Sequence, residues 1–150
     1  MTLSSTTAPL DQPIPQATAD AFCALTGDDQ WIHIDPARAE AEGLAGGDTV
    51  LPGALLLSLA VGGLGKALGY PEGTRSWQRS YERVRFLRPA PVGSRLRLEA
   101  RESRRRPAGT GREVVVANVS LYSDLVEAGP VMEGCFTSLL EVAVQPDTAE

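Results

Sequence analysis

Residues 53–68 form the segment that most restricts how this chain can fold. The pattern predicts a helix whose side chains are apolar on nearly every side, with Ser58 and Lys66 as the only polar ones. A helix with almost no polar face must be covered on most sides. The apolar run is too short, and too interrupted by proline and glycine, to cross a bilayer. The sequence therefore predicts a buried central helix that other elements surround.

The residues after this helix supply the cover. Four strand-like runs follow, at 77–87, 94–104, 113–123 and 130–144. Charged and apolar side chains alternate in these runs, which is typical of an antiparallel sheet with one wet face. The breaks between the runs are rich in proline and glycine, as turns require. The sequence therefore predicts an α+β fold in which an antiparallel sheet wraps around the long central apolar helix.

The N-terminal half reads as short helices. The pattern predicts one helix over residues 15–26, closed by Gly27, and a second over 36–42 between Pro36 and Gly43. Proline suits a first helical turn and glycine suits the position after the last one. We expect residues 1–13 to be a flexible arm, 14–144 a single domain and 145–150 a frayed tail.

Charge argues against some classes of partner. The chain has 150 residues and a formal net charge of −5, so we expect no binding to nucleic acid, which needs a basic surface. The basic residues that follow Arg75 are all arginines. Arginine suits phosphate groups, so an anion-binding surface is one interpretation. Solvated faces of strands are the interpretation we favour.

The cysteines and the N-terminal residues indicate in which cellular compartment the protein is expected. Cys23 and Cys135 lie in apolar surroundings, with neither metal-ligand spacing nor a disulfide pattern. Free buried thiols in a reducing compartment are then expected. The first residues carry neither the basic start nor the apolar stretch of a signal peptide. We therefore predict a cytoplasmic protein that does not bind membranes.

His33 is the only histidine of the chain, and it follows Asp28 by five residues. Trp31 and Ile32 supply apolar surface beside it. Imidazole is the side chain best suited to proton transfer near neutral pH, and a carboxylate that converges on it can help to activate a water molecule. The alternative is that His33 only packs or caps a turn.

These residues resemble a known motif. Residues 26–36 are similar to the hydratase motif of the MaoC-like (R)-specific enoyl-CoA hydratases, in the version of the nodulation-protein-N-like branch. The resemblance continues at 50–53, 83–86 and 89–94 and covers roughly residues 15–143. It implies a hotdog fold and a homodimer with two sites. It also implies reversible hydration of a trans-2-enoyl thioester of coenzyme A or acyl carrier protein to the (R)-3-hydroxyacyl thioester, with no metal or redox cofactor.

The resemblance also implies roles for three residues. Asp28 and His33 would hold and deprotonate the water that attacks C3, and their conjugate acid would help to protonate C2. Gly53 would offer its backbone N–H to the thioester oxygen, where charge develops. It lies at a helix start, where unpaired amides and the positive end of the dipole point outward. An ordinary helix-start glycine after Pro52 is the alternative.

The chain departs from the family pattern in the same region. Pro52 replaces a histidine, the pair Gln30-Trp31 replaces Asn-Pro, and Val61 replaces a serine that some members place near the substrate. We assign Gln30, Trp31 and Pro52 to substrate binding. A core or dimer-interface position for Trp31 is equally open.

Other polar residues have simpler interpretations. Asp29 reads as a solvated loop carboxylate, and Asp35 as the N-cap of the helix that Pro36 opens. Ser58 is expected to bond back to its own helix. The cluster Arg104–Arg106 reads as a solvated turn, with a coenzyme A phosphate or an acidic carrier protein as the alternative partner.

Three functions remain open at this point. The first is the hydratase or dehydratase. The second is a biosynthetic tailoring enzyme that adds or eliminates another nucleophile or closes a ring, which the four departures suggest. The third is a non-catalytic subunit that binds an acyl thioester. Thioester hydrolysis ranks low, because hotdog thioesterases generally use a carboxylate on the central helix and 53–68 has none.

Overall fold

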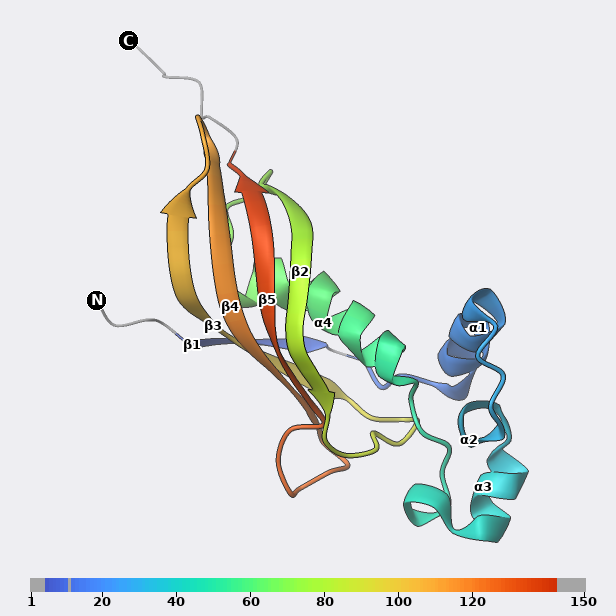
Figure 1. Cartoon of the computed structure of the whole chain (residues 1–150). Helices are drawn as coiled ribbons and strands as arrows, with labels where there is room; N and C mark the ends of the chain where they lie inside the picture. The colour runs from blue at the N-terminus through green and yellow to red at the C-terminus, as the bar shows by residue number, and fades with distance from the viewer. Residues whose placement is uncertain (1–4, 11, 143–150) are drawn as a thin grey trace.

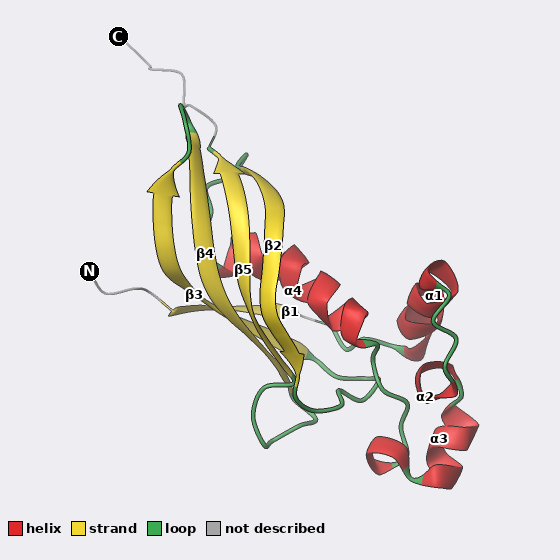
Figure 2. Cartoon of the chain, in the orientation of Figure 1, coloured by secondary structure: helices red, strands yellow, loops and turns green. Residues whose placement is uncertain are grey.

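The computed structural model describes residues 5–10 and 12–142. One antiparallel sheet with the strand order β1-β3-β4-β5-β2 forms its main layer (Figure 2). The strands are β1 (Ser5–Leu10), β2 (Arg75–Phe86), β3 (Leu96–Pro107), β4 (Arg112–Ser123) and β5 (Met132–Glu141). The helices are α1 (Gln16–Thr26), α2 (Trp31–Ile34), α3 (Pro36–Glu42), the 3₁₀ helix η1 (Leu44–Gly46) and α4 (Gly53–Ala67).

Helix α4 is the predicted central helix, and the sheet curls around it (Figure 1). Its side chains Leu55, Leu56 and Leu64 are buried, as is Phe136 of β5 in the same core cluster. This burial is the main source of stability in such a fold, because apolar surface leaves water. In the described part of the chain, no helix has the length and apolar character needed to cross a membrane.

The sheet has one core face and one wet face, as the alternation predicted. In β3 the buried Leu96, Leu98 and Ala100 alternate with the exposed Arg97 and Arg101. Arg97 and Arg101 therefore lie on the solvated face, in agreement with the favoured interpretation of the charge pattern. Both cysteines are free and buried.

The N-terminal arm differs from the prediction. We expected residues 1–13 to be flexible, but residues 5–10 form β1, which pairs antiparallel with β3 from Ser5↔Arg101 to Leu10↔Leu96. The expectation of a flexible arm is therefore wrong for this stretch, because the open edge of β3 offers backbone partners that no local pattern reveals. An edge strand also tolerates Pro9. The predicted tail at 145–150 lies outside the described residues.

Strand β2 contains a bulge that alters which side chains face α4. The pairing with β5 shifts between Glu82 and Arg85, and Arg83 has a φ of 52°. A positive φ is strained for arginine, and a bulge re-aims the residues that follow it. Val84 packs on the core cluster. Phe86 therefore also points to the α4 side, although simple alternation from Tyr81 would place it on the other face.

Candidate active site

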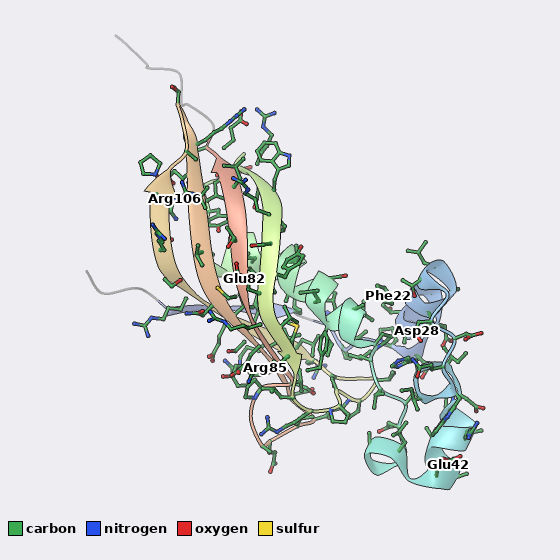
Figure 3. The ribbon with its side chains drawn as sticks, viewed as in Figure 1. Phe22, Asp28, Glu42, Glu82, Arg85 and Arg106 are labelled. Atoms are coloured by element: carbon green, nitrogen blue, oxygen red, sulfur yellow. The ribbon has the colours of Figure 1, made fainter. Side chains whose placement is uncertain are left out.

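Asp28 and His33 come together in the helical segment, residues 16–47, which lies beyond the N-terminal end of α4 (Figures 1 and 3). Gly27 ends α1 with a φ of 78°, a left-handed conformation that suits glycine, and the chain then turns into α2. His33 Nε2 lies 3.7 Å from Asp28 Oδ2. The imidazole is buried, with 8% of its side chain exposed, whereas 39% of the Asp28 side chain is exposed. The predicted pair therefore exists and is open to solvent on the carboxylate side.

A backbone carbonyl fixes the protonation pattern of the imidazole. His33 Nδ1 lies 2.7 Å from the carbonyl oxygen of Val50. A carbonyl only accepts hydrogen bonds, so Nδ1 carries a hydrogen and donates it. In the neutral ring the lone pair is then on Nε2, which faces Asp28.

Two acceptors consequently face each other across the site. A carboxylate oxygen and a neutral Nε2 each accept a hydrogen bond. Their separation of 3.7 Å is too long for a direct hydrogen bond. A water molecule that donates one hydrogen to each group satisfies both, and protonation of Nε2 is the other solution. The arrangement therefore suits a polarised water at Nε2.

Gln16 holds the backbone of His33 in place through hydrogen bonds. Its Nε2 donates to the backbone oxygen of His33 at 2.7 Å, and its Oε1 accepts from Thr49 Oγ1 at 2.5 Å. Val50, the next residue, donates its N–H to the oxygen of Ile32 at 2.9 Å. Together these bonds attach α2 to residues 49–50. Sequence reasoning missed Gln16 and Thr49, and no local signal marks residues so far from the motif.

Gln30 forms a hydrogen bond with the carboxylate of Asp28. Its Nε2 donates to Asp28 Oδ1 at 2.9 Å, which leaves Oδ2 toward His33. Gln30 therefore orients the carboxylate of the pair. We assigned Gln30 to substrate binding, and that role stays a prediction.

Gly53 is the first residue of α4, as predicted. The first hydrogen bond of the helix runs from Leu55 N–H to Pro52 C=O at 3.0 Å, so the amides of Gly53 and Ala54 precede it. Such amides carry the positive end of the helix dipole. Gly53 follows Val50 by three residues, so it lies within about 10 Å of the carbonyl that binds His33. The helix start and the Asp28/His33 pair therefore belong to one region.

Phe86 covers Gly53. A β-carbon on Gly53 would lie 3.0–3.1 Å from three atoms of the Phe86 ring, closer than real side chains pack. Only glycine fits beneath this ring without a shift. About half of the Phe86 residue, 51%, remains exposed. Sequence reasoning missed Phe86, because the bulge at Arg83 sets the direction of its side chain.

Two other predicted substrate-binding residues have defined positions. The Arg38 guanidinium stacks on the Trp31 ring at 4.2 Å from its centroid. Pro52 is buried and is the N-cap residue of α4. Contact of either residue with a substrate stays a prediction.

The simpler interpretations of Asp35, Ser58 and Asp29 are confirmed. Asp35 accepts a hydrogen bond from Arg38 N–H at 3.0 Å and so caps α3. Ser58 donates to the oxygen of Ala54 at 2.9 Å, within its own helix. Asp29 is exposed.

The cluster Arg104–Arg106 is far from the pair within this chain. Figure 3 shows Arg106 near the end of the sheet opposite the segment that carries Asp28. Arg105 forms ion pairs with Glu102, at 2.8 Å, and with Glu113. The cluster is part of strand β3, which pairs with β4 as far as Pro107↔Glu113, so the solvated turn that we expected here is wrong, although the three side chains are exposed.

Cys23 is not suited to be a nucleophile. Burial, and then the carboxylates of Asp28, Asp20 and Asp29, raise the pKa of its thiol. The thiolate is the reactive form, and this environment disfavours it.

Among the described residues, no group of three or more His, Cys, Asp or Glu side chains is placed so that it could hold a metal ion.

Comparison with known proteins identifies the family. The model of the MaoC like domain matches residues 4–123. The 3-hydroxyacyl-thioester dehydratase Z of Mycobacterium tuberculosis (strain ATCC 25618 / H37Rv) is 37% identical over an alignment of 93 positions that covers 56% of this chain and 54% of that protein. Nodulation protein N of Rhizobium leguminosarum bv. viciae is 39% identical over an alignment of 88 positions that covers 56% of this chain and 52% of that protein. The chain thus spans about half the length of these curated relatives.

Solved structures agree on the fold. The MaoC-like dehydratase from Rhodospirillum rubrum superposes with a TM-score of 0.73 at 17% identity, covering 97% of this chain and 95% of that one. The (R)-hydratase from A. caviae involved in PHA biosynthesis gives 0.66 at 23% identity, covering 95% and 98%. These likenesses show the hotdog fold, as the resemblance of the motif implied. With its family model matched over most of its length, the chain belongs to the MaoC-like domain family of hydratases and dehydratases.

Proposed function

We propose that this protein catalyses the reversible hydration of a trans-2-enoyl thioester to the (R)-3-hydroxyacyl thioester. The observation that carries the proposal is the pair of acceptors, Asp28 Oδ2 and His33 Nε2, 3.7 Å apart with Nδ1 bound to a carbonyl. The name of the dehydratase relative supports it. The aligned part makes up about half of that protein.

In the proposed reaction, water donates one hydrogen to His33 Nε2 and the other to Asp28 Oδ2. As its oxygen attacks C3, the O–H bond to Nε2 breaks and the proton moves to the imidazole. The C2–C3 π electrons shift into the thioester, giving an enolate. The proton on Nε2 then returns to C2, so water is added across the double bond and no redox step occurs. Dehydration runs through the same steps in reverse.

The enolate oxygen needs a hydrogen-bond donor. In the proposal the N–H of Gly53 at the start of α4 supplies it, assisted by the helix dipole. Because no β-carbon covers this amide, a thioester can approach it closely. Phe86, half exposed above Gly53, would form a wall beside the thioester.

The test is turnover of crotonyl-CoA and of a longer enoyl-CoA, followed through the loss of enoyl absorbance. We expect Asp28→Asn and His33→Ala to lower kcat/KM by about 10²–10⁴-fold, the range for loss of general acid–base catalysis. Asp29→Asn is the matched control, because this neighbouring carboxylate is exposed. Unchanged turnover in both site variants would refute the proposal. No turnover by the folded wild type would favour a dedicated pathway intermediate as substrate, or binding without catalysis.

We further propose a homodimer that acts on a coenzyme A or acyl-carrier-protein thioester. Strand β2 is an edge of the sheet and exposes Trp77, Tyr81 and Phe86 by 43–51%. An edge strand with exposed aromatic side chains favours pairing with another chain. Sedimentation velocity tests this, and a monomer at all concentrations would contradict it.

The buried free thiols of Cys23 and Cys135 support the proposed cytoplasmic location.

A further inference from the structure

The ring of Phe86 occupies space beside the amide that the proposed mechanism uses. Its outer atoms, Cζ and the two Cε atoms, lie 3.0–3.1 Å from the position that a β-carbon on Gly53 would take. A β-carbon is about 2.5 Å from its own backbone nitrogen, as standard bond lengths require. The end of the ring therefore lies within about 5.6 Å of the Gly53 nitrogen.

A bound thioester would place its reacting carbon close to the same nitrogen. The oxygen that accepts the hydrogen bond from Gly53 would lie about 2.9 Å from that nitrogen. C2 is two bonds from this oxygen, a distance of about 2.4 Å. Both C2 and the end of the ring would thus lie within about 5–6 Å of one atom. Since non-bonded carbon atoms keep about 3.5–4.0 Å apart, little room remains for a further carbon on C2.

The bulge of β2 sets the direction of this ring. The pairing shift places two residues of β2, Arg83 and Val84, opposite Gly134 of β5. A β-carbon on Gly134 would lie 3.1 Å from a methyl carbon of Val84 and 3.0 Å from the ring of Phe136, so glycine leaves the room that the bulge needs. Without the bulge, the alternation of the strand would turn the ring of Phe86 to the other face of the sheet.

The backbone after the bulge is held by the core. Phe86 pairs with Met132, and the N–H of Leu87 donates to the oxygen of Val131 at 2.8 Å. Met132 and Val131 are completely buried. The ring therefore projects from a fixed backbone, and a group that needs its space has to rotate the side chain away from Gly53.

We propose that Phe86 selects enoyl thioesters that carry only hydrogen on C2. A thioester with a methyl group on C2 would have to displace the ring or lose the hydrogen bond from Gly53, and either change lowers kcat/KM. The inference rests on the proposed function, because the Gly53 amide sets the position of the thioester.

The test compares the turnover of crotonyl-CoA with that of (E)-2-methylcrotonyl-CoA. A methyl group on C2 also makes the double bond less reactive, so the quantity to follow is the change that Phe86→Ala makes in the ratio of the two kcat/KM values. We expect this variant to lower the preference for crotonyl-CoA by about ten-fold or more, since one methylene in a tight site is worth about 10–200-fold. Phe86→Leu, which keeps more of the apolar side chain, should give an intermediate ratio.

Trp77→Ala is the matched control. Trp77 is an aromatic residue of the same strand with a similar exposure, 45%, and it pairs with Leu139 near the start of β2. We expect this variant to keep the ratio of the wild type. A similar loss of preference in Trp77→Ala would overturn the inference, because the edge strand as a whole would then set the preference.

Binding of saturated ligands separates size from reactivity and does not depend on a variant. Isothermal titration compares butyryl-CoA with 2-methylbutyryl-CoA. We expect the wild type to bind butyryl-CoA more tightly by about five-fold or more, the lower end of what overpacking costs, and Phe86→Ala to lose this difference. Equal affinity of the wild type for the two ligands, or an unchanged turnover ratio in Phe86→Ala, would overturn the inference. Failure of the wild type to turn over crotonyl-CoA would instead count against the proposed function, and the inference would fall with it.

Discussion

The helical segment and the sheet with α4 are held together by different forces. In α1, α2 and α3 the buried residues are small or polar: Ala19, Cys23, His33 and Ala39. In α4 they include Leu55, Leu56 and Leu64, which pack on the sheet. Large buried apolar side chains each contribute about 1.5–3 kcal/mol to folding. The sheet with α4 therefore carries most of the stability.

The position of the helical segment depends on hydrogen bonds instead. His33 bonds to Val50 O at 2.7 Å, and Gln16 bridges His33 O and Thr49. Each such bond contributes about 0.5–1.5 kcal/mol to stability, and it requires a particular orientation of donor and acceptor. The geometry of the Asp28/His33 pair can therefore be disturbed while the fold remains, whereas unfolding of the sheet with α4 would also disrupt the pair.

The largest expected effect comes from the sheet. Phe136 is fully buried and makes an edge-to-face contact with Tyr81 at 5.1 Å between centroids. We expect Phe136→Ala to lower the free energy of unfolding by about 3–5 kcal/mol, because it leaves a cavity. Phe22→Ala is the matched control in the helical segment, where the ring is only partly buried. Urea unfolding measures both, and an equal or larger loss in Phe22→Ala would contradict the comparison.

The next effect lies at the junction of the two regions, where Phe86 covers Gly53. Gly53→Ala should cost about 1–3 kcal/mol, because the new methyl group collides with the ring at 3.0–3.1 Å. In a Phe86→Ala background the same change meets no ring. There it should be neutral or stabilising by up to about 1 kcal/mol, since alanine favours helices over glycine.

Urea unfolding of the four proteins measures this sign change. A cost of Gly53→Ala that is the same with and without the ring would mean that the ring moves away freely. Turnover is measured on the same set. Activity that Gly53→Ala lowers in both backgrounds would indicate that the methyl group also obstructs the thioester.

The sequence predicted those parts of the fold that depend on local periodicity. The apolar face of 53–68 and the alternation around Leu96, Leu98 and Ala100 each follow from burial of neighbouring positions, so helix α4 and strands β2 to β5 were found. The pair Asp28 and His33 was found because both residues lie in one short motif. These signals are local.

The missed features depend on distant partners. Strand β1 exists because β3 has an open edge, and Gln16 reaches Thr49 across 33 residues. Phe86 points to Gly53 because the bulge at Arg83 reverses the alternation. Each is a consequence of tertiary packing, which a window of neighbouring residues does not contain.

The smallest effect on stability is expected from the helical segment. Gln16→Met keeps the size of the side chain but removes its bonds to His33 O and Thr49 Oγ1. Thr49 is 2% exposed, so its hydroxyl loses its partner inside the protein. We expect a loss of about 1–2 kcal/mol in the free energy of unfolding.

The same variant should separate site geometry from fold. Hydrogen exchange should speed up in α1 and α2 while the amides of β4 and β5 keep their protection, because these regions open separately. Since the bond to His33 O is lost, kcat should fall by more than the small stability loss explains. Gln78→Met is the matched control in the sheet, where Gln78 bonds to Ser138, and it should leave the α1 and α2 amides unchanged. If Gln16→Met speeds exchange equally in the sheet, the two regions open as one unit, and polar contacts do not hold the pair separately from the core.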